Sequence, residues 1–212
     1  MKGLFLHKTP QLLQAIFPNF WWRKSRLEKT VYLTFDDGPV PEATPLILKC
    51  LREYGAKATF FCVGENIVKN PKIFHQLIEE EHGVGNHTHH HLNGWETDTD
   101  DFINDIVLCQ KQFDKHLGSN SKPLMRPPYG RLKYSQWKSL LKDYEIVMWD
   151  VLSGDFSKRI SREVCLRKSI QYTKSGSIVL FHDSVKTVNK LEFVLPKYLE
   201  HFSRLGYSFQ RL

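Results

Sequence analysis

From Thr30 to the end of the chain, short apolar runs alternate with longer stretches in which apolar residues recur at helical spacing. Turn-forming residues such as Asp37-Gly38-Pro39 bound the runs, which is typical of buried strands. Strands are predicted over residues 31–35, 58–63, 84–86, 123–125, 145–149, 177–181 and 207–212. About seven strands alternating with helices indicate an α/β fold, with a parallel sheet and helices outside it, either open or closed into a barrel.

The stretches between these runs predict the helices. In one of them Ile73, Phe74, Leu77 and Ile78 fall on one helical face, between Asn70-Pro71 and the terminating Gly83. The predicted helices cover residues 45–55, 70–83, 102–118, 134–141, 161–172 and 191–205.

Residues 1–28 stand apart from this alternation and are interpreted as an N-terminal extension to a domain over 29–212. Five apolar residues in the extension have helical spacing, and Trp21-Trp22-Arg23-Lys24 follows them: Leu12, Leu13, Ile16, Phe17 and Phe20. We expect this apolar face to pack against the bottom or side of the barrel. The alternative is a peripheral membrane contact, because aromatic and basic residues suit a membrane surface.

Neither an export signal nor a membrane span is predicted. The N-terminal segment has no apolar region of about 7–15 residues, and the chain has no run of about 18 apolar residues. A cytoplasmic location is therefore the one most compatible with the sequence.

Composition narrows the class of protein. The 212 residues are 41% hydrophobic and 25% charged, which fits one globular domain better than a disordered chain. The net charge of +7 would suit an anionic partner, but the basic residues are scattered, so a solvated basic surface is favoured over nucleic-acid binding. The cysteines lie in apolar stretches without a C-x-x-C pair, which predicts buried free thiols: Cys50, Cys62, Cys109 and Cys165.

Polar clusters follow several of the predicted strands. They are Asp36-Asp37, residues 87–91, residues 126–130, Asp155 and His182-Asp183. In parallel α/β folds, functional residues gather beyond the carboxyl ends of the strands. These clusters are therefore expected on one rim of the sheet.

Two of the clusters together suggest a metal site. His87 and His91 are spaced i, i+4, so we expect them to face the same way on a helical turn, with His89 and His90 pointing elsewhere. Two imidazoles and the Asp37 carboxylate suit a divalent metal with open positions. The neighbouring aspartate is then free to act as a base. Taken singly, the aspartate pair could be a turn, although a functional pair is favoured, and the histidine cluster is more often a polar loop.

The remaining clusters offer further chemistry. Residues 126–130, Arg-Pro-Pro-Tyr-Gly, form either a rigid surface turn or a fixed loop in which Arg126 holds a carboxylate and a backbone N–H faces a developing oxyanion. A lone histidine at the end of an apolar strand is more often structural. Beside a metal site, however, His182 becomes a candidate general acid.

Five segments in this order resemble the motifs of the polysaccharide deacetylase family. They are T-F-D-D-G-P, H-T-x-x-H, R-P-P-Y-G, W-D-x-x-S-x-D and L-F-H-D, between Thr34 and Asp183. The family includes chitin, chitooligosaccharide and peptidoglycan N-acetylglucosamine deacetylases and acetylxylan esterases. The resemblance implies a distorted, incomplete (β/α) barrel and one divalent metal ion, usually zinc, on Asp37, His87 and His91.

The resemblance also implies roles for other residues. Asp36 would be the general base, oriented and tuned by Arg126, and the backbone N–H of Tyr129 would help to stabilise the oxyanion. His182 would protonate the leaving group, with Asp155 keeping it basic. The implied substrate contacts are Pro128, Tyr129, Leu180, which would receive the acetyl methyl group, and Phe156.

The match departs from the family in one segment. Leu152 stands where the family often has an acidic residue, and Phe156 where it often has Trp, although Asp155 is retained. The wall of the substrate groove is therefore altered, which leaves the substrate open.

The implied activity is metal-dependent removal of N-acetyl groups from an N-acetylglucosamine-containing glycan, with an acetylated oligo- or polysaccharide as partner. Alternatives are O-deacetylation of a polysaccharide such as xylan and deacylation of a lipid-linked amino sugar. A catalytically silent glycan-binding module is a third, against which the intact set of aspartates and histidines argues.

Overall fold

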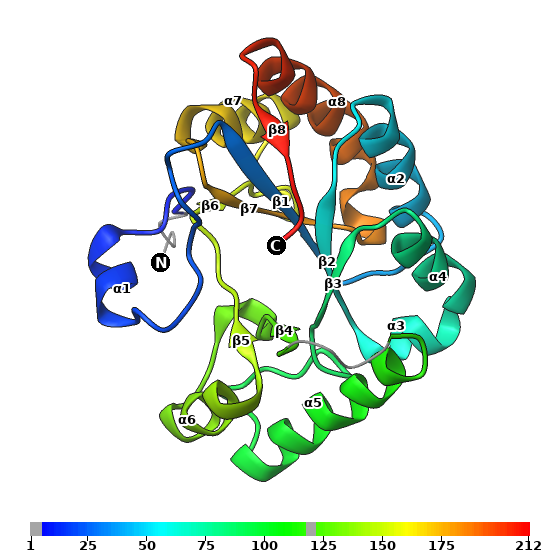
Figure 1. The fold of residues 1–212 in the computed structure, drawn as a ribbon, viewed down its shortest axis with the longest axis vertical. Helices are drawn as coiled ribbons and strands as arrows, with labels where there is room; N and C mark the ends of the chain where they lie inside the picture. The colour runs from blue at the N-terminus through cyan, green and yellow to red at the C-terminus, as the bar shows by residue number, and fades with distance from the viewer. Residues whose placement is uncertain (1–5, 118–121) are drawn as a thin grey trace.

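Seven parallel strands form a curled, open half-barrel in the computed structural model, which describes residues 6–117 and 122–212 (Figure 1). The order of the strands across the sheet is β5-β4-β3-β2-β1-β7-β6. Their bounds are β1 Thr30–Asp36, β2 Ala58–Cys62, β3 Gly83–Asn86, β4 Leu124–Met125, β5 Glu145–Ile146, β6 Val151–Leu152 and β7 Ile178–His182. An eighth strand, β8 (Ser208–Phe209), pairs in parallel with the beginning of β1. The predicted α/β half-barrel is thus confirmed.

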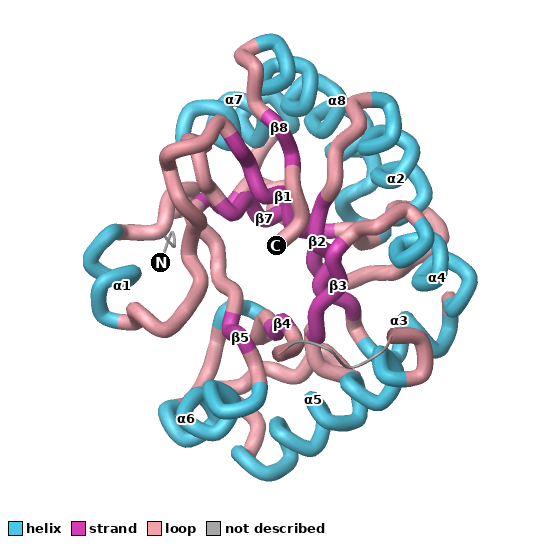
Figure 2. The backbone as a smooth tube through the Cα atoms, viewed as in Figure 1, coloured by secondary structure: helices cyan, strands magenta, loops and turns pink. Residues whose placement is uncertain are grey.

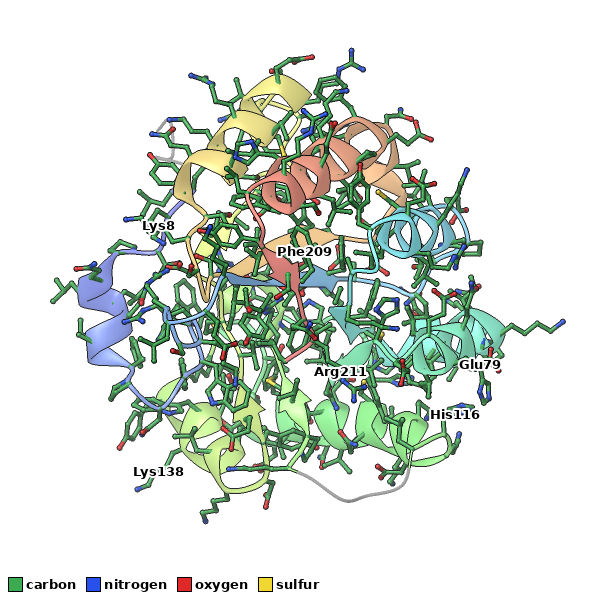
Figure 3. All side chains as sticks on the ribbon, turned by 45° about the horizontal axis from the view of Figure 1, so that its top comes forward. Lys8, Glu79, His116, Lys138, Phe209 and Arg211 are labelled. Atoms are coloured by element: carbon green, nitrogen blue, oxygen red, sulfur yellow. The ribbon has the colours of Figure 1, made fainter. Side chains whose placement is uncertain are left out.

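Helices surround the outside of the sheet (Figure 2). Their bounds are α1 Gln11–Ile16, α2 Thr44–Glu53, α3 Gly64–Lys69, α4 Pro71–Glu79, α5 Thr99–Asp114, α6 Tyr134–Asp143, α7 Arg162–Tyr172 and α8 Val188–Arg204, with short 3₁₀ turns at Pro128–Gly130 and Val185–Thr187. Because helices cover its outer face and side chains fill its inner one, a central strand is buried along its whole length, as β2 is. Phe209 of β8 lies over the central strands, whereas Glu79 and Lys138 lie on the outer surface (Figure 3).

The register of the strands aligns their carboxyl ends. Asp36, the last residue of β1, lies beside Phe61 of β2 and beside His182, the last residue of β7. Two polar side chains that are far apart in the sequence therefore emerge next to each other at one rim.

The sequence prediction fails in three places. Residues 145–149 do not form one strand: β5 ends at Ile146, and the chain then crosses to the other edge of the sheet, where residues 151–152 form β6. Helix α3 was not predicted, because its six residues are too few for a periodic pattern. Helix α5 ends at Asp114, and the predicted end at Gly118 lies outside the described residues.

The N-terminal segment closes the gap between the two edge strands. Trp21 forms a parallel bridge with Val147, and Lys8 an antiparallel bridge with Val151. The Asp150 carboxylate, fully buried between these bridges, binds Lys8 Nζ at 2.6 Å and Arg26 Nη2 at 3.2 Å. The extension is thus fastened to the barrel by backbone hydrogen bonds and a buried carboxylate.

The predicted packing of the extension is only partly right. Helix α1 ends at Ile16, because Pro18 disfavours a helical conformation at Phe17, and none of its residues is buried. Packing comes instead from the residues that follow. The rings of Phe17 and Phe20 lie 5.4 and 5.7 Å from that of Trp137 on α6. Leu12, in contrast, is exposed to solvent.

Two smaller expectations concern thiols and membrane spans. The four cysteines are free and buried, as predicted. Within residues 6–117 and 122–212, no helix combines the length and the apolar character needed to cross a membrane.

Candidate active site

A cavity of about 320 Å³ opens at the carboxyl ends of the strands. The residues that line it come from β1, β6 and β7 and from the loops that follow β1, β3, β4, β5, β6 and β7. They are Asp36, Asp37, His87, His91, Tyr129, Gly130, Arg131, Trp149, Leu152, Phe156, Leu180, His182 and Lys186. Four of the five polar clusters expected on one rim therefore contribute to one cavity, whereas the fifth, Asp155, does not line it and contacts it only through His182.

Three possible metal ligands converge in this cavity. Donor atoms of Asp37, His87 and His91 all lie within 4.8 Å of one another. Asp37 Oδ1 is 3.2 Å from His91 Nε2 and 3.8 Å from His87 Nε2. Across the described parts of the chain, no other group of three such side chains brings its donor atoms together in this way.

The protonation state of His87 suits a metal ligand. Its Nδ1 lies 2.7 Å from the carbonyl oxygen of Arg126, which can only accept, so Nδ1 carries the proton and Nε2 presents a lone pair. Burial, offset only in part by Asp36, lowers the pKa of His87 to about 4 and keeps the ring neutral. A neutral imidazole held by a backbone carbonyl is the usual form of a metal-binding histidine. The donor set thus fits a divalent cation.

The loop that carries the two histidines is not the predicted helical turn. Thr88 and His91 have positive φ angles of 63° and 56°, which break a helix. Side chains hold the loop instead: Asn86 Oδ1 accepts from the N–H of Thr88 at 2.9 Å, and the Asp105 carboxylate accepts from the next two N–H groups at 2.7 and 3.0 Å. The rings of residues 89 and 90 do not line the cavity, as expected.

Asp36 is paired with a buried arginine. Its Oδ1 accepts a hydrogen bond of 2.7 Å from Arg126 Nη1, and its Oδ2 lies 3.8 Å from His87 Nε2. The guanidinium of Arg126 is fully buried. It also donates hydrogen bonds to Thr34 Oγ1 and to the carbonyl oxygens of Val147 and Met148, and it stacks on the ring of Phe61. One oxygen of Asp36 is therefore held in place while the other faces the histidines.

Asp37 lies just beyond β1, with a φ angle of 89°. Burial alone would raise the pKa of its carboxyl group, but the hydrogen bond with His91 and the charges of His182 and His87 outweigh burial and hold the pKa well below its usual range. The side chain is therefore an anion over the physiological pH range.

His182 is paired with a buried carboxylate at the end of β7. Its Nδ1 donates to Asp155 Oδ1 at 2.9 Å, and its backbone N–H donates to Asp155 Oδ2 at 2.7 Å. Burial would lower the pKa of the imidazole, but Asp155, helped by the two aspartates that follow β1, outweighs burial and raises the pKa to about 9. The ring is therefore cationic and its Nε2 can give up a proton.

The other expected residues lie as follows. Tyr129 has a φ angle of 60°, and among the described residues its backbone N–H has no hydrogen-bond acceptor. Its ring centroid is 4.9 Å from that of His91. Leu180 and Phe156 line the cavity, whereas Pro128 is buried and does not line it.

Sequence reasoning missed part of the cavity wall. Lys186 Nζ lies 3.6 Å from Asp37 Oδ2, and Arg131 lines the cavity with its guanidinium carbon 5.8 Å from the ring of Tyr129. Both are cations close to a motif: Arg131 directly follows R-P-P-Y-G, and Lys186 comes three residues after L-F-H-D. Their position next to these motifs was the only feature of the sequence that could have identified them as cavity residues.

Comparisons with known proteins agree with this geometry. Residues 23–148 match a family model described as polysaccharide deacetylase. The chain is 34% identical over 192 residues to a peptidoglycan-N-acetylglucosamine deacetylase of Bacillus cereus, covering 89% of this chain and 88% of the relative. It is 32% identical over 164 residues to a chitooligosaccharide deacetylase of Azorhizobium caulinodans, covering 76% and 77%. The solved structure of a peptidoglycan N-acetylglucosamine deacetylase in complex with 4-naphthalen-1-yl-N-oxidanyl-benzamide matches with a TM-score of 0.87 and 30% identity, over 96% of this chain and 95% of that one.

Proposed function

The chain belongs to the polysaccharide deacetylase family, and from that premise we propose that it removes N-acetyl groups from an N-acetylglucosamine-containing glycan in a metal-dependent hydrolysis. One observation carries the proposal. A set of metal ligands, a carboxylate held by a buried arginine and a cationic histidine all face a single cavity at the carboxyl ends of the strands.

Asp37, His87 and His91 would hold the metal ion, and zinc suits two imidazoles and one carboxylate. When bound, a divalent ion supplies a Lewis acid that polarises the acetyl carbonyl and makes water a better nucleophile.

Asp36 acts as the general base and accepts the proton of the attacking water on its free oxygen. Arg126 holds the other oxygen at 2.7 Å and keeps the carboxylate in one orientation. The backbone N–H of Tyr129, which has no acceptor among residues 6–117 and 122–212, donates to the oxyanion that forms on the acetyl group.

His182 completes the reaction by giving the proton on Nε2 to the departing amine. The Asp155 carboxylate fixes the ring through Nδ1, so that only Nε2 faces the cavity. Leu180 and Phe156 provide apolar surface for the acetyl methyl group and the sugar, and Pro128 supports the turn that carries Tyr129.

Acetate release tests this proposal. The zinc-loaded protein is incubated with N-acetylated chitooligosaccharides, peptidoglycan fragments and acetylated xylan, with and without a chelator. We expect release from the N-acetylated substrates, its loss with the chelator and its return with zinc. His201→Ala, which removes an exposed histidine that does not line the cavity, serves as a control and should release acetate as the wild type does. Absence of release from every N-acetylated substrate by zinc-loaded protein would contradict the proposal.

A further inference from the structure

Two histidines meet on the outer surface of the half-barrel, away from the catalytic cavity. His75 lies on α4, and His116 follows the last residue of α5 by two positions. His116 Nδ1 is 3.1 Å from His75 Nε2, and the two ring planes are nearly perpendicular, at 86°. Neither residue belongs to the five motifs or lines the catalytic cavity, so the proposed hydrolysis gives this pair no role.

The distance between the two nitrogens is close to the one that a shared metal ion requires. Zinc binds an imidazole nitrogen at about 2.0–2.1 Å, so two such nitrogens are roughly 3.3 Å apart at a tetrahedral angle and roughly 2.9 Å apart at a right angle. The observed 3.1 Å lies between these values. An ion would lie beside the line that joins the two nitrogens, and the exposed His75 is free to turn its ring toward that point.

The chemistry of the pair also suits a metal ion. The pKa of His116 is lowered, first by burial and then by the charges of His75 and Lys115, so the ring of His116 is neutral at pH 7. In a hydrogen bond between two neutral imidazoles, one nitrogen carries the shared proton. A tautomer shift moves this proton to the other nitrogen of the same ring and leaves both facing nitrogens with a lone pair. Imidazole is a preferred ligand of zinc, copper and nickel ions.

Packing holds His116 in position before any ion arrives. Its ring lies edge-to-face on the ring of Phe74, with the centroids 5.4 Å apart, and Phe74 lies 5.3 Å from Phe113 of α5. Phe74 is fully buried. A ligand that is already ordered loses less conformational entropy on binding, so this packing favours a defined site over a chance contact.

Glu79 is placed to add a third ligand. It comes four residues after His75 on α4, and residues with this spacing share one face of a helix. Glu79 is exposed, and both Glu79 and His116 lie at the right-hand edge of the molecule in Figure 3. Its carboxylate does not converge with the two nitrogens in the structure, so the side chain has to turn toward the ion.

We propose that His75 and His116 form a second metal site, which binds one divalent transition metal ion such as zinc, takes Glu79 as an additional ligand and joins α4 to the end of α5. The two histidines are 41 residues apart, and only the folded chain brings them together. A bound ion should therefore stabilise the fold. The proposal is independent of the proposed deacetylation and would stand if the protein released no acetate.

Zinc titration of the full chain tests the site. The protein is first loaded with one equivalent of zinc and freed of excess metal, and zinc chloride is then added in a calorimeter. We expect about one further equivalent per chain, with a Kd on the order of 1–100 µM, since the site has fewer ligands than a closed structural zinc site. The second equivalent should also raise Tm.

Two variants assign this equivalent to the histidine pair. His75→Ala removes an exposed ring, and His116→Phe removes the ligand but keeps an aromatic ring against Phe74. Each should weaken the second binding event by at least about tenfold, abolish the rise in Tm and leave acetate release at the wild-type level. His201→Ala is the matched control, because it removes an exposed histidine on α8 whose ring also contacts a phenylalanine.

The role of Glu79 has its own pair of variants. Glu79→Gln should weaken the second binding event by severalfold, which is less than the loss of a histidine, because the carboxylate has to turn toward the ion. Glu192→Gln, at an exposed glutamate on α8, is the control and should bind zinc as the wild type does. An unchanged Kd in Glu79→Gln would overturn its assignment as a ligand.

Copper(II) chloride gives a spectroscopic view of the ligands, because copper has the highest affinity in this series of ions. One equivalent added to the zinc-loaded protein should show coupling to two imidazole nitrogens in electron paramagnetic resonance. His75→Ala and His116→Phe should each show one such nitrogen fewer.

Three outcomes would overturn the histidine site. The wild type could take up no second equivalent of zinc. The second equivalent could bind equally well to His75→Ala and His116→Phe, which would place it elsewhere on the chain. An equal loss in His201→Ala would mean that zinc binds weakly to any exposed histidine rather than to this pair.

Discussion

Replacing Asp36 and Asp37 by asparagine, one at a time, should separate turnover from metal binding. The two carboxylates are adjacent in the sequence, but their contacts differ. Asp36 is held by Arg126 and offers one oxygen to the cavity, whereas Asp37 lies 3.2 Å from His91 among the possible metal ligands. Asn preserves the shape of each side chain and removes its charge and its basicity.

Asp36→Asn should keep the metal and lose about 10²–10⁴-fold in kcat, or about 3–5 kcal/mol of transition-state stabilisation. The variant should also be less stable, because the buried Arg126 loses its anionic partner. The amide oxygen can still accept from Nη1, and Arg126 keeps its bonds to Thr34, Val147 and Met148. We therefore expect a loss of up to about 3 kcal/mol, or roughly 6–12 °C in Tm, at the low end of the range for breaking a buried ion pair.

Asp37→Asn should behave in the opposite way. Loss of an anionic ligand should weaken zinc binding by more than the roughly 10–100-fold that removal of an outer-shell partner costs. Its activity should recover in part when zinc is in excess, because Asp36 is intact.

Zinc titration, acetate release and thermal melting on both variants measure the three effects. Asp143→Asn, at an exposed aspartate at the end of α6, serves as the control and should match the wild type in all three. If Asp36→Asn loses the metal and Asp37→Asn keeps it, the assigned roles are reversed.

Three other predictions concern the leaving-group acid, pH and the extension. His182→Ala should retain zinc and lose about 10²-fold or more in turnover, and near-normal acetate release would make His182 structural. In protein from which a chelator has removed the metal, the pKa of His182 is raised to about 9, so protonation of His182 stabilises the folded state by about 3 kcal/mol. This contribution is fully present below about pH 6.5 and is lost as the pH rises through 9. Melting at pH 7 and 10 should reveal this loss, and Asp155→Asn should shrink the difference; an unchanged difference would refute the coupling. Deleting residues 1–22 should lower Tm, because it removes the buried Trp22 and one cation from Asp150; unchanged melting with lost binding to vesicles would favour a membrane anchor instead.

The sequence predicted those parts of the fold whose apolar pattern is long enough to read. β1, β2 and β7 are continuous apolar runs, and the long helices have clear periodicity. The two-residue strands β4, β5 and β6 have no such pattern, because their place is set by neighbours rather than by their own residues. Residues 145–149 were predicted as one strand because residues 146–149 are all apolar, although β5 ends at Ile146.

The candidate site was predictable in composition but not in shape. The motifs named the side chains that meet in the cavity, since the carboxyl ends of parallel strands share one rim. The backbone conformation of the histidine loop could not be predicted from its own residues. The positive φ angles of Thr88 and His91 occur in a loop that is held by Asn86 and by Asp105 of helix α5. Arg131 and Lys186 were missed because isolated cations carry no pattern of their own.

The bridges of the N-terminal segment to Val147 and Val151 impose an order on folding. Thr9 Oγ1 donates to the carbonyl of Trp149, 140 residues later in the chain. During synthesis this segment leaves the ribosome well before residues 147–151, so Phe17 and Phe20 remain without their partners in the barrel until those residues have been made. The contacts of Phe17 and Phe20 with the barrel can therefore form only after residues 147–151 have been made, and a chaperone that holds the emerging N-terminal segment would delay these contacts without delaying the pairing of β1 with β2.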